Sequence, residues 1–552
     1  MREDTTIDCD LLVVGGGING AGIARDAAGR GLSVVLCEKD DLGAHTSSAS
    51  SKLIHGGLRY LEYREFGLVR KALAERETLL RSAPHIMRPL RFVMPHVPGQ
   101  RPAWLIRAGL FLYDRLAPRA FLPASHAIEL AGHPAGAPLK PEFARAFAYS
   151  DGWVDDARLV VLNALDAHER GARVLTHATC TGVSRRAAHW EAHVEQGGAP
   201  LTVRARGLVN AAGPWAARFA LGANRAAPHR ALRLVKGSHI VVPRLFDHGC
   251  GYLFQHADGR VVFALPYEEA FTLVGTTDVV YEGDPGAATI GEGETRYLCE
   301  LVNRYFKRQL APGDVVWSYS GVRPLLDDAA GSAAAITRDY FLERDGEGPP
   351  LLSVFGGKIT TYRKLAEEAV DWIAPLLGTT PTGAWTANAV LPGGDLFGPQ
   401  PDSRGVLEFE RWVAALQRRH AWLPKPLALR CARAYGTRVD VLLGGCQGLA
   451  DMGVEVAPGL YEAELRYLMA HEWAACAQDV LWRRTKLGLH LRPGVADRID
   501  AWMAAHRPRR VGGYAADASI VVGADVAPDD LAANHHRVGG EAANPTDVGN
   551  RY

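Results

Sequence analysis

The sequence lacks the features that mark several classes of protein. Its eight cysteines are scattered without a C-x-x-C pair, so their spacing predicts no zinc or iron–sulfur site. No uninterrupted apolar run approaches the roughly 18 residues of a membrane-spanning helix. Lysine plus arginine total 62 against 61 for aspartate plus glutamate, so no overall charge favours a nucleic acid. We therefore expect no bound metal, no nucleic-acid partner and only peripheral contact with a membrane.

What the chain does contain is typical of a large folded protein. Its 552 residues are 47% hydrophobic and 22% charged, and at roughly 150 residues per domain this length predicts several structural units. Arg2, Glu3 and Asp4 are followed almost at once by a strand pattern, which leaves no room for the apolar core of a signal peptide. We expect the protein to be made and folded in the cytoplasm.

The N-terminal pattern predicts a strand–helix–strand unit. An apolar run at 8–14 stops at three glycines, a helical pattern covers 18–30, and a second strand follows at 33–37. Gly31 stands where a helix C-terminus favours glycine. This arrangement is typical of an α/β nucleotide-binding domain.

The turn of this unit, residues 15–20, satisfies the dinucleotide-binding pattern G-x-G-x-x-G. Gly15 is expected to make the turn, Gly17 to let the backbone approach a pyrophosphate, and Gly20 to let the helix pack closely on the strand. Glu38 stands at the end of the second strand, where an acid accepts hydrogen bonds from ribose hydroxyls and disfavours a 2′-phosphate. The helix N-terminus adds N–H donors for phosphate oxygens. The turn therefore predicts a bound dinucleotide.

A hydroxyl-rich stretch, residues 45–57, favours FAD over NAD. It contains five serines or threonines and ends in a pair of glycines. A cofactor as large as FAD needs a second length of closely approaching backbone, with short hydrogen-bond donors along its pyrophosphate and ribityl chain.

Later segments predict that the nucleotide-binding sheet is assembled from separated pieces. Strand patterns at 204–209 and 351–355 each run into a glycine turn, and a helix is expected to begin at Tyr362 after the second turn. Between them, residues 238–242, 259–266 and 271–275 alternate as the strands of an antiparallel sheet do. A strand-rich substrate region is therefore expected to be inserted into the nucleotide-binding domain.

The C-terminal part is predicted to be a separate helical domain. Residues 391–402 are rich in proline and glycine, as linkers are. Helical patterns follow at 427–435, 461–480 and 495–507. From residue 511 the chain is rich in alanine, glycine and aspartate, and we expect this tail to be disordered.

Motifs spread from about residue 8 to about residue 505 point to one family. They are GGGINGAGIARDAAGRGLSVVLCE (15–38), TSSASSKLIHGGLRYLE (46–62), DGWVDDARLV (151–160), GLVNAAGPW (207–215), KGSHIVVPR (236–244), VGTTDV (274–279), WSYSGVRPL (317–325), AITRDY (335–340), FGGKITTYRKLAE (355–367), YEAELRYLMAHEW (461–473) and DVLWRRTKLGL (479–489). Together they resemble the bacterial aerobic glycerol-3-phosphate dehydrogenases, the FAD-dependent respiratory kind. The tail has no counterpart in this resemblance.

The resemblance implies an α/β fold with a glutathione-reductase-type FAD-binding Rossmann domain. It also implies an inserted mixed or antiparallel β-sheet substrate domain and an all-helical C-terminal domain. The boundaries we predict are 8–80, 150–232 and 345–388 for the FAD domain, 81–149 and 233–344 for the substrate domain, 389–510 for the helical domain and 511–552 for the tail. A homodimer, attached peripherally to the inner face of the cytoplasmic membrane, is implied as well.

The implied reaction is oxidation of glycerol 3-phosphate at C2 to dihydroxyacetone phosphate, with electrons passed to ubiquinone in glycerol or glycerophospholipid catabolism. The nearest alternative is an oxidase of the same family that reduces oxygen to hydrogen peroxide. An FAD amine or amino-acid oxidase and a non-catalytic flavin scaffold or sensor are further alternatives. Motif spacing alone does not separate the acceptors.

The residues expected to bind the substrate lie in glycine-bearing turns. Arg59 and Tyr60 follow one glycine pair, and Lys358 and Thr361 follow another. Arg323 precedes a proline that disfavours helix. Guanidinium and ammonium groups suit a phosphate dianion, so these five residues are the predicted substrate-binding set.

His239 is the predicted proton acceptor, because its ordinary pKa near 6.5 suits the removal of a hydroxyl proton. Arg323 and Lys358 are predicted as catalytic residues too, since either could stabilise a developing alkoxide. The division of labour among these three stays open. Residues 276–278 are expected to form a wall or turn of the site.

The predicted cofactor-binding residues come from the matching segments. They are Gly15, Gly17, Ile18, Asn19, Gly20, Glu38, Lys39, Thr46, Ser47, Ser48, Ser50, Ser51, Lys52, Leu53, His55, Gly56, Gly57, Ala212, Gly213, Gly356, Gly357, Lys358, Ile359 and Thr360. His55 is expected to shape the flavin loop rather than to transfer protons.

Residues 101–116 combine apolar residues with Arg101, Arg107 and Arg115. That composition suits an amphipathic helix lying at a bilayer surface, although an ordinary helix packed on a core has a similar pattern. We take this segment as the candidate for membrane contact near a quinone entry.

Overall fold

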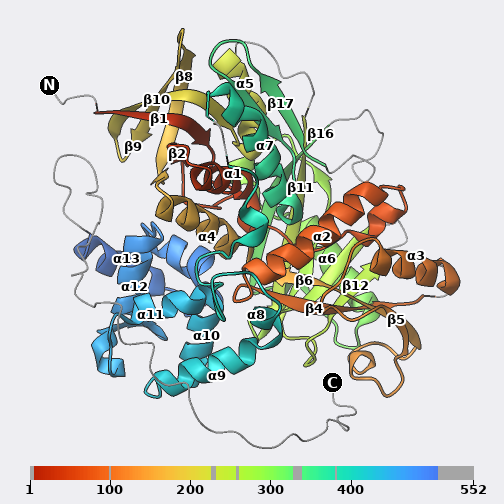
Figure 1. Cartoon of the computed structure of the whole chain (residues 1–552). Helices are drawn as coiled ribbons and strands as arrows, with labels where there is room; N and C mark the ends of the chain where they lie inside the picture. The colour runs from red at the N-terminus through yellow and green to blue at the C-terminus, as the bar shows by residue number, and fades with distance from the viewer. Residues whose placement is uncertain are drawn as a thin grey trace, which may run out of the picture. The chain divides into compact units, whose positions relative to one another are not determined.

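The computed structural model of the chain describes residues 5–97, 101–224, 232–255, 260–326, 339–379 and 382–507 (Figure 1). The predicted disordered tail, 511–552, lies outside the described residues, as does the first residue of the predicted strand 259–266. Within the described residues the chain forms two large sheets and a helical C-terminal part.

The first sheet has a parallel core with the strand order β17-β18-β10-β1-β2-β7. Its strands are β1 (Thr5–Val14), β2 (Val34–Cys37), β7 (Arg173–Leu175), β8 (Ala178–Arg185), β9 (Trp190–Gln196), β10 (Ala199–Asn210), β17 (Phe341–Asp345) and β18 (Leu351–Phe355). β1, β10 and β18 are parallel neighbours although they are far apart in sequence, while β17 is antiparallel to β18 and the β8–β9 hairpin extends from β10. The prediction of a sheet built from separated pieces is confirmed.

Helices cover this sheet through one shared hydrophobic core. α1 (Ile18–Gly29), α4 (Asp156–Glu169) and α7 (Tyr362–Leu376) contribute Ala21, Leu159 and Leu365, all fully buried, to the same cluster as β1. Asp155 is the N-cap of α4, and its side chain accepts a hydrogen bond from Arg158 N at 3.1 Å. The predicted strand–helix–strand unit and the helix beginning at Tyr362 are both present.

The second sheet is mixed and mostly antiparallel. Its strands are β3 (Leu53–Ile54), β4 (Met87–Pro95), β5 (His126–Glu129), β6 (Arg145–Val154), β11 (Leu232–Pro243), β12 (Gly251–Gln255), β13 (Val261–Tyr267), β14 (Phe271–Gly275), β15 (Val279–Val280) and β16 (Trp317–Leu326). β4 and β12 are parallel, whereas the other neighbours are antiparallel. The predicted boundary at residue 150 divides β6, which lies wholly in this sheet, and β3, within the predicted 8–80 segment, also pairs here.

Three further helices accompany the sheets. They are α2 (Phe66–Ser82), α5 (Ala216–Asn224) and α6 (Glu292–Tyr305). α6 packs Leu298 and Val302 on the second sheet, and α2 packs Val69 and Leu73 in a separate cluster with β4 and β6. A fourth helix, α3 (Ala103–Arg115), lies at the edge of the ribbon in Figure 1.

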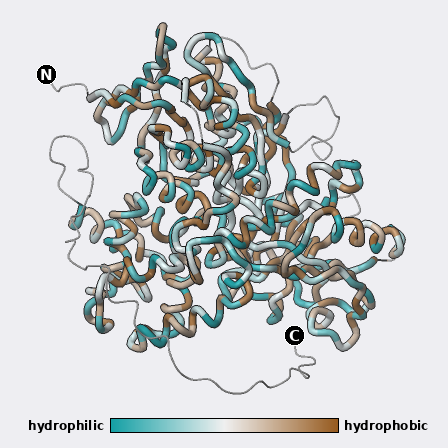
Figure 2. Tube along the Cα trace, in the orientation of Figure 1, coloured by the Kyte–Doolittle hydropathy of each residue, from teal (hydrophilic) through white to brown (hydrophobic). Residues whose placement is uncertain are grey.

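The C-terminal part is helical apart from one short hairpin. Its elements are α8 (Arg404–Leu407), α9 (Phe409–Arg419), α10 (Lys425–Tyr435), α11 (Val439–Leu443), β19 (Glu455–Ala457), β20 (Leu460–Tyr461), α12 (Glu462–His471), a π-helical turn (Asp479–Arg484) and α13 (Val495–Ala505). The tube of this part alternates between hydrophilic and hydrophobic colours in Figure 2, as helices with one buried face do.

One helix prediction needs correction. The pattern at 461–480 predicted one continuous helix, but α12 ends at His471, and Trp473 has a left-handed φ of 56°. The buried Glu472 next to this break pairs with Arg158 of α4. A long-range ion pair therefore coincides with the point where the local pattern is interrupted.

Buried ion pairs join the C-terminal part to the nucleotide-binding sheet. Asp41, three residues beyond Glu38, accepts hydrogen bonds from Arg484 at 2.6 and 2.7 Å and a further bond from Arg483. Lys486 donates to Asp155 at 2.9 Å. The predicted domains are therefore packed together through charged contacts that exclude water.

Candidate active site

A cavity of about 1510 Å³ is lined by residues of both sheets. Gly15, Ala211 and Gly356, which follow the carboxyl ends of β1, β10 and β18, contribute to its wall. Ligands of open α/β sheets bind in the crevice outside these strand ends. The strand order thus brings three turns that are distant in sequence to one site.

Most of the predicted site residues line this cavity. They are Gly15, Gly17, Ile18, Asn19, Glu38, Lys39, Thr46, Ser47, Ser50, Ser51, Leu53, His55, Gly57, Arg59, Tyr60, Ala212, Gly213, His239, Arg323, Gly356, Gly357, Lys358, Ile359 and Thr360. Gly20, Ser48, Lys52, Gly56 and Thr361 lie behind the wall instead.

The dinucleotide turn has no room for side chains. Gly15 has a φ of 112°, which favours glycine, and a Cβ there would lie 2.4 Å from Ala211 O. A Cβ on Gly20 would lie 1.8 Å from Gly15 O. Gly20 therefore does not face the cavity but lets α1 pack against the turn, which is the role that the pattern predicted.

Glu38 closes the turn at its expected place. Its carboxylate accepts hydrogen bonds from Gly16 N at 2.6 Å and from Asp40 N at 2.9 Å. Burial raises the pKa of Glu38 above its usual range, while these two backbone donors oppose the change. The carboxylate is held at the cavity wall, where it can accept from a hydroxyl.

The serine-rich loop makes two kinds of contact. Ser47 accepts a hydrogen bond from Ile18 N at 3.0 Å, next to the N-terminus of α1, and Thr46 donates to Val322 O at 2.7 Å. Ser50 donates to Asp156 at 2.7 Å on the α4 side. The loop thus ties α1, α4 and β16 together along one side of the cavity.

Lys52, predicted to bind the cofactor, is directed away from the cavity. Its buried ammonium donates to Ser48 O at 3.0 Å and to the two carboxylate oxygens of Asp156 at 2.7 and 2.9 Å. The sequence did not predict that Asp156 pairs with Lys52, because Asp155 and Asp156 together have the pattern of a helix N-terminus. The Lys52–Asp156 pair holds the loop in place from behind.

His239 lies on β11 with its ring almost fully buried at the cavity. Its Nε2 lies 2.8 Å from Ser51 Oγ, and its ring stacks on Tyr319 with centroids 4.8 Å apart. Within the described residues His239 Nδ1 has no hydrogen-bond partner. Burial, with the nearby charges of Lys52 and Arg323, lowers the pKa of His239 well below its ordinary value. The ring is therefore neutral at neutral pH.

Arg323 projects from β16 toward the loop that follows β14. It pairs with Asp278 and donates to Thr276 Oγ1 at 3.0 Å. Thr276 and Asp278 line the cavity, whereas Thr277 is buried and does not. A Cβ on Gly237 would lie 2.0 Å from Arg323 Nη2. The guanidinium is therefore fixed by an acid on one side and by a glycine that makes room for it on the other.

Arg59, Tyr60 and Lys358 form a second cationic group on the cavity wall. Lys358 Nζ lies 3.8 Å from the centroid of the Tyr60 ring, a cation–π contact. Arg59 Nη2 donates to Tyr63 Oη at 3.4 Å. Thr361 is buried behind Lys358. Two separate turns thus bring cations to the same cavity, as expected for an anionic ligand.

α3 lies beside the cavity and is largely exposed. Within it only Leu110 and Tyr113 are buried, while Leu105, Ile106 and Leu112 contribute to the cavity wall. Trp104 is 71% exposed and Phe111 53%. The expected amphipathic segment therefore places apolar side chains at the edge of the site. No helix among the described residues is long and apolar enough to cross a membrane.

Comparison with known proteins shows the family to which the chain belongs. A family model described as "FAD dependent oxidoreductase" matches residues 10–363, and one described as "C-terminal domain of alpha-glycerophosphate oxidase" matches residues 384–506. The fold and the site therefore define an FAD-dependent oxidoreductase, which confirms the predicted cofactor and fold.

Curated relatives narrow the class. A "Glycerol-3-phosphate dehydrogenase" of Pseudomonas aeruginosa is 54% identical over 91% of this chain and 96% of that protein. An "Aerobic glycerol-3-phosphate dehydrogenase" of Escherichia coli is 50% identical over 91% of this chain and 98% of that protein. The chain belongs to the family of the bacterial FAD-dependent glycerol-3-phosphate dehydrogenases, as the motif resemblance predicted. A "D-erythritol 1-phosphate dehydrogenase" of Brucella abortus is 49% identical over 89% of this chain and 96% of that protein.

A solved structure agrees with this placement. A glycerol-3-phosphate dehydrogenase from Bacillus halodurans, complexed with FAD, superposes with a TM-score of 0.72 and 28% identity. The match covers 92% of this chain and 91% of that chain.

The residues present fit FAD. The glycine turn leaves a space that side chains would fill, and Asn19 Oδ1 is buried at the cavity without a hydrogen-bond partner among the described residues. Glu38 stands where ribose hydroxyls would be bound, and the loop from Thr46 to Ser51 offers hydroxyl groups on the same wall.

Proposed function

We propose that the protein oxidises glycerol 3-phosphate at C2 to dihydroxyacetone phosphate. The observation that carries the proposal is one cavity that joins a dinucleotide turn to Arg59, Arg323, Lys358 and a buried His239. When bound, FAD supplies the hydride acceptor for such an oxidation.

The cations of the cavity suit a small phosphate dianion. Arg59 and Arg323 carry planar guanidinium groups that can bind phosphate oxygens with two hydrogen bonds, and Lys358 adds a point charge. The pairing of Arg323 with Asp278 fixes the direction in which this guanidinium points. These contacts orient the alcohol carbon within the cavity.

His239 is assigned the C2 hydroxyl proton. Its neutral ring has a lone pair available, and Ser51 lies within hydrogen-bond distance of Nε2. Burial is the main cause of the low pKa of His239 and the charge of Arg323 is a lesser one, so an anion bound to Arg323 would offset only that lesser part. Substrate binding would thus make His239 a better proton acceptor. Arg323 and Lys358 would stabilise the developing alkoxide.

Anaerobic reduction tests the reaction itself. Glycerol 3-phosphate added to the purified holoenzyme without an acceptor should bleach the oxidised flavin absorption band, because one substrate molecule gives one hydride to each bound FAD. D-Erythritol 1-phosphate is the matched comparison substrate, because the relative named "D-erythritol 1-phosphate dehydrogenase" is 49% identical to this chain. A flavin that stays oxidised with glycerol 3-phosphate but bleaches with erythritol 1-phosphate would reassign the substrate.

The electron acceptor we propose is ubiquinone in the cytoplasmic membrane, with the protein bound peripherally on the inner face as a homodimer. Support comes from α3, whose exposed Trp104 and Phe111 lie seven positions apart and so share one helix face. Arg115 lies over the Phe111 ring at 4.3 Å, beside that face. An apolar face bordered by arginine suits a bilayer surface. Reoxidation of the reduced flavin faster by a quinone analogue than by air would distinguish this dehydrogenase from an oxidase.

Charged substitutions on α3 test the membrane contact. The variants Trp104→Asp and Phe111→Asp should lose most of their co-sedimentation with vesicles containing anionic lipid, because each adds a charge to the apolar face. Activity with a soluble dye should remain, since neither residue lines the cavity. Leu407→Asp on α8, at a position 66% exposed, is the matched control. Equal sedimentation of all three variants would contradict the role of α3.

A further inference from the structure

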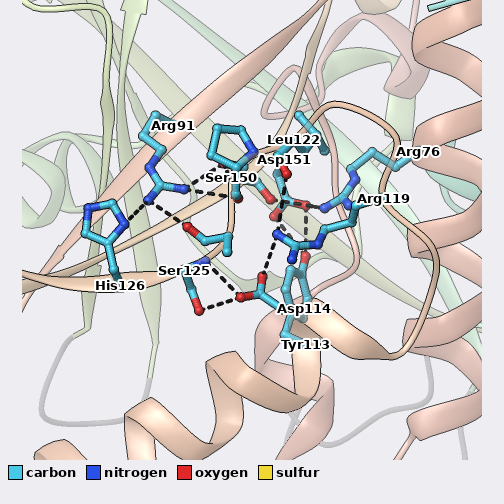
Figure 3. Close-up of polar contacts among 12 residues, drawn as sticks. Arg76, Arg91, Tyr113, Asp114, Arg119, Leu122, Ser125, His126, Ser150 and Asp151 are labelled. Carbon is cyan, nitrogen blue, oxygen red and sulfur yellow. Dashed lines mark hydrogen bonds and ion pairs between the residues drawn. The ribbon is translucent and has the colours of Figure 1, made fainter. Parts of the chain in front are cut away.

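A series of buried hydrogen bonds connects α3 to the loop that carries Arg59. Gly56 N donates to Tyr113 Oη at 2.9 Å, and Tyr113 Oη lies 2.9 Å from both carboxylate oxygens of Asp151. Arg76 donates to Asp151 at 2.8 Å and to Ser150 O at 3.0 Å. Figure 3 shows Tyr113, Asp151 and Arg76 converging beside the helix that carries Tyr113. Sequence reasoning singled out none of these three side chains.

The groups that carry hydrogens determine which atom donates and which accepts in each of these hydrogen bonds. A phenol has a single hydrogen, and Asp151, paired with Arg76, takes it as an acceptor. The lone pairs of Tyr113 are then left for Gly56 N–H. Burial keeps Tyr113 protonated by raising its pKa well above the ordinary value. The hydroxyl is therefore a fixed acceptor directed at the backbone of the loop.

The loop backbone is confined on both sides at this point. A Cβ on Gly56 would lie 2.7 Å from Tyr113 Oη and 2.6 Å from Leu73 Cδ2. Gly57 has a φ of 75°, and a Cβ there would lie 2.2 Å from the Tyr60 ring. Tyr113 thus contacts Gly56, which precedes the turn that carries Arg59 and Tyr60.

α3 contacts the same segment at a second point. Arg101, just before α3, pairs with Glu62, just after the turn. Tyr113 near the end of α3 and Arg101 before its start therefore hold the segment from Gly56 to Glu62 at its two ends. Any shift of α3 is passed to the Arg59 turn.

We propose that Tyr113 is a positioning residue that sets the affinity for the phosphorylated substrate by holding the 56–62 segment against the cavity. The inference rests on the proposed function only for the identity of that substrate. The Tyr113 hydroxyl of α3 is hydrogen-bonded to the loop that carries Arg59, so the position of α3 controls how the 56–62 segment presents Arg59 to the substrate.

The test is Tyr113→Phe, which keeps the ring packed edge-on against Tyr149 at 6.1 Å and removes only the oxygen. The KM for glycerol 3-phosphate should rise about tenfold, because Gly56 N–H loses its hydrogen bond to the phenol oxygen. The kcat with a soluble dye should change less than about twofold and the FAD content should stay the same, since no group that touches the reacting atoms is altered.

Hydrogen exchange gives a readout that does not depend on activity. Amide exchange of a peptide covering residues 55–62 should speed up in Tyr113→Phe, because the hydrogen bond from Gly56 N–H to the phenol oxygen is lost. Tyr252→Phe is the matched control, since Tyr252 is also buried in the second sheet and its hydroxyl donates to Ala135 O at 2.6 Å, away from the loop. Neither the KM nor the exchange of 55–62 should change in the control.

Each outcome decides the proposal. Unchanged KM and unchanged exchange in a folded Tyr113→Phe protein would overturn it, as would an equal rise of KM in Tyr252→Phe. If Tyr113→Phe does not fold, Arg101→Ala removes the second contact between α3 and the 56–62 segment, at a side chain that is 41% exposed. Unchanged KM and unchanged exchange in that variant would overturn the proposal too. Failure of the wild-type flavin to bleach with glycerol 3-phosphate would instead refute the proposed function, and the exchange result would still stand or fall separately.

Discussion

Replacing Arg323 with alanine is expected to raise the KM for glycerol 3-phosphate and to lower kcat/KM by about 10- to 100-fold. A hydrogen bond to a charged group contributes about 1.5 to 3 kcal/mol, and about 1.4 kcal/mol corresponds to a factor of ten. Steady-state kinetics with a soluble dye measure the effect. Bound FAD should remain, because Arg323 pairs with Asp278 and Thr276 rather than with the dinucleotide turn.

Two further variants sharpen this prediction. Arg323→Lys should recover part of the loss, since a lysine supplies the charge without the fork of donors. Arg411→Ala, whose side chain is 75% exposed and pairs with Glu408, should leave the kinetics unchanged. A wild-type KM in Arg323→Ala would refute the assignment of this arginine to the phosphate.

Replacing Asp41 with alanine is expected to lower the free energy of unfolding by about 3 to 5 kcal/mol, because a buried ion pair loses one partner. Asp41 is 1% exposed and accepts two hydrogen bonds from Arg484, which is itself 1% exposed, and a further one from Arg483. The shift of the thermal or urea transition at a fixed concentration of FAD measures the loss. FAD should also dissociate faster, since Asp41 lies three residues beyond Glu38.

The matched control for Asp41 is a pair on the surface. Asp440 lies 3.0 Å from Arg419, and both side chains are about half exposed. Asp440→Ala should cost less than about 1 kcal/mol, as exposed ion pairs do. Equal shifts of the transition in the two variants would show that the contact between Asp41 and the C-terminal part is not a stabilising one.

Local patterns were sufficient for the nucleotide-binding unit. The run of apolar residues before Gly15, the helical spacing after it and the acid at Glu38 all depend on neighbours within one strand–helix–strand unit. β18 and the start of α7 were predicted for the same reason. Residues that follow a glycine turn also arrived at the cavity, because the ends of parallel strands meet at one edge.

Those local patterns could not predict ion pairs and hydrogen bonds between residues that are far apart in the sequence. Lys52 looked like a cofactor ligand within its loop, but its partner Asp156 is 104 positions away and directs its charge behind the cavity wall. The helix predicted at 461–480 ends at His471, next to Glu472, which pairs with Arg158 of α4. A periodic pattern predicts only that Tyr113 and Asp151 are buried, and it does not predict that they are hydrogen-bonded to each other. In each case the deciding partner is a charged or polar group on another element.

The order of the first sheet has a consequence for how the protein is made. β1 pairs with β10, and β10 pairs with β18, so its neighbours come from the start, the middle and the later part of the chain. The wall that carries Gly15, Ala212 and Gly356 is incomplete on the ribosome until residue 357 has emerged. The bonds from Arg484 to Asp41 form later still. We expect nascent chains to expose unpaired strand edges for most of synthesis, and FAD to be taken up only late in synthesis or after it.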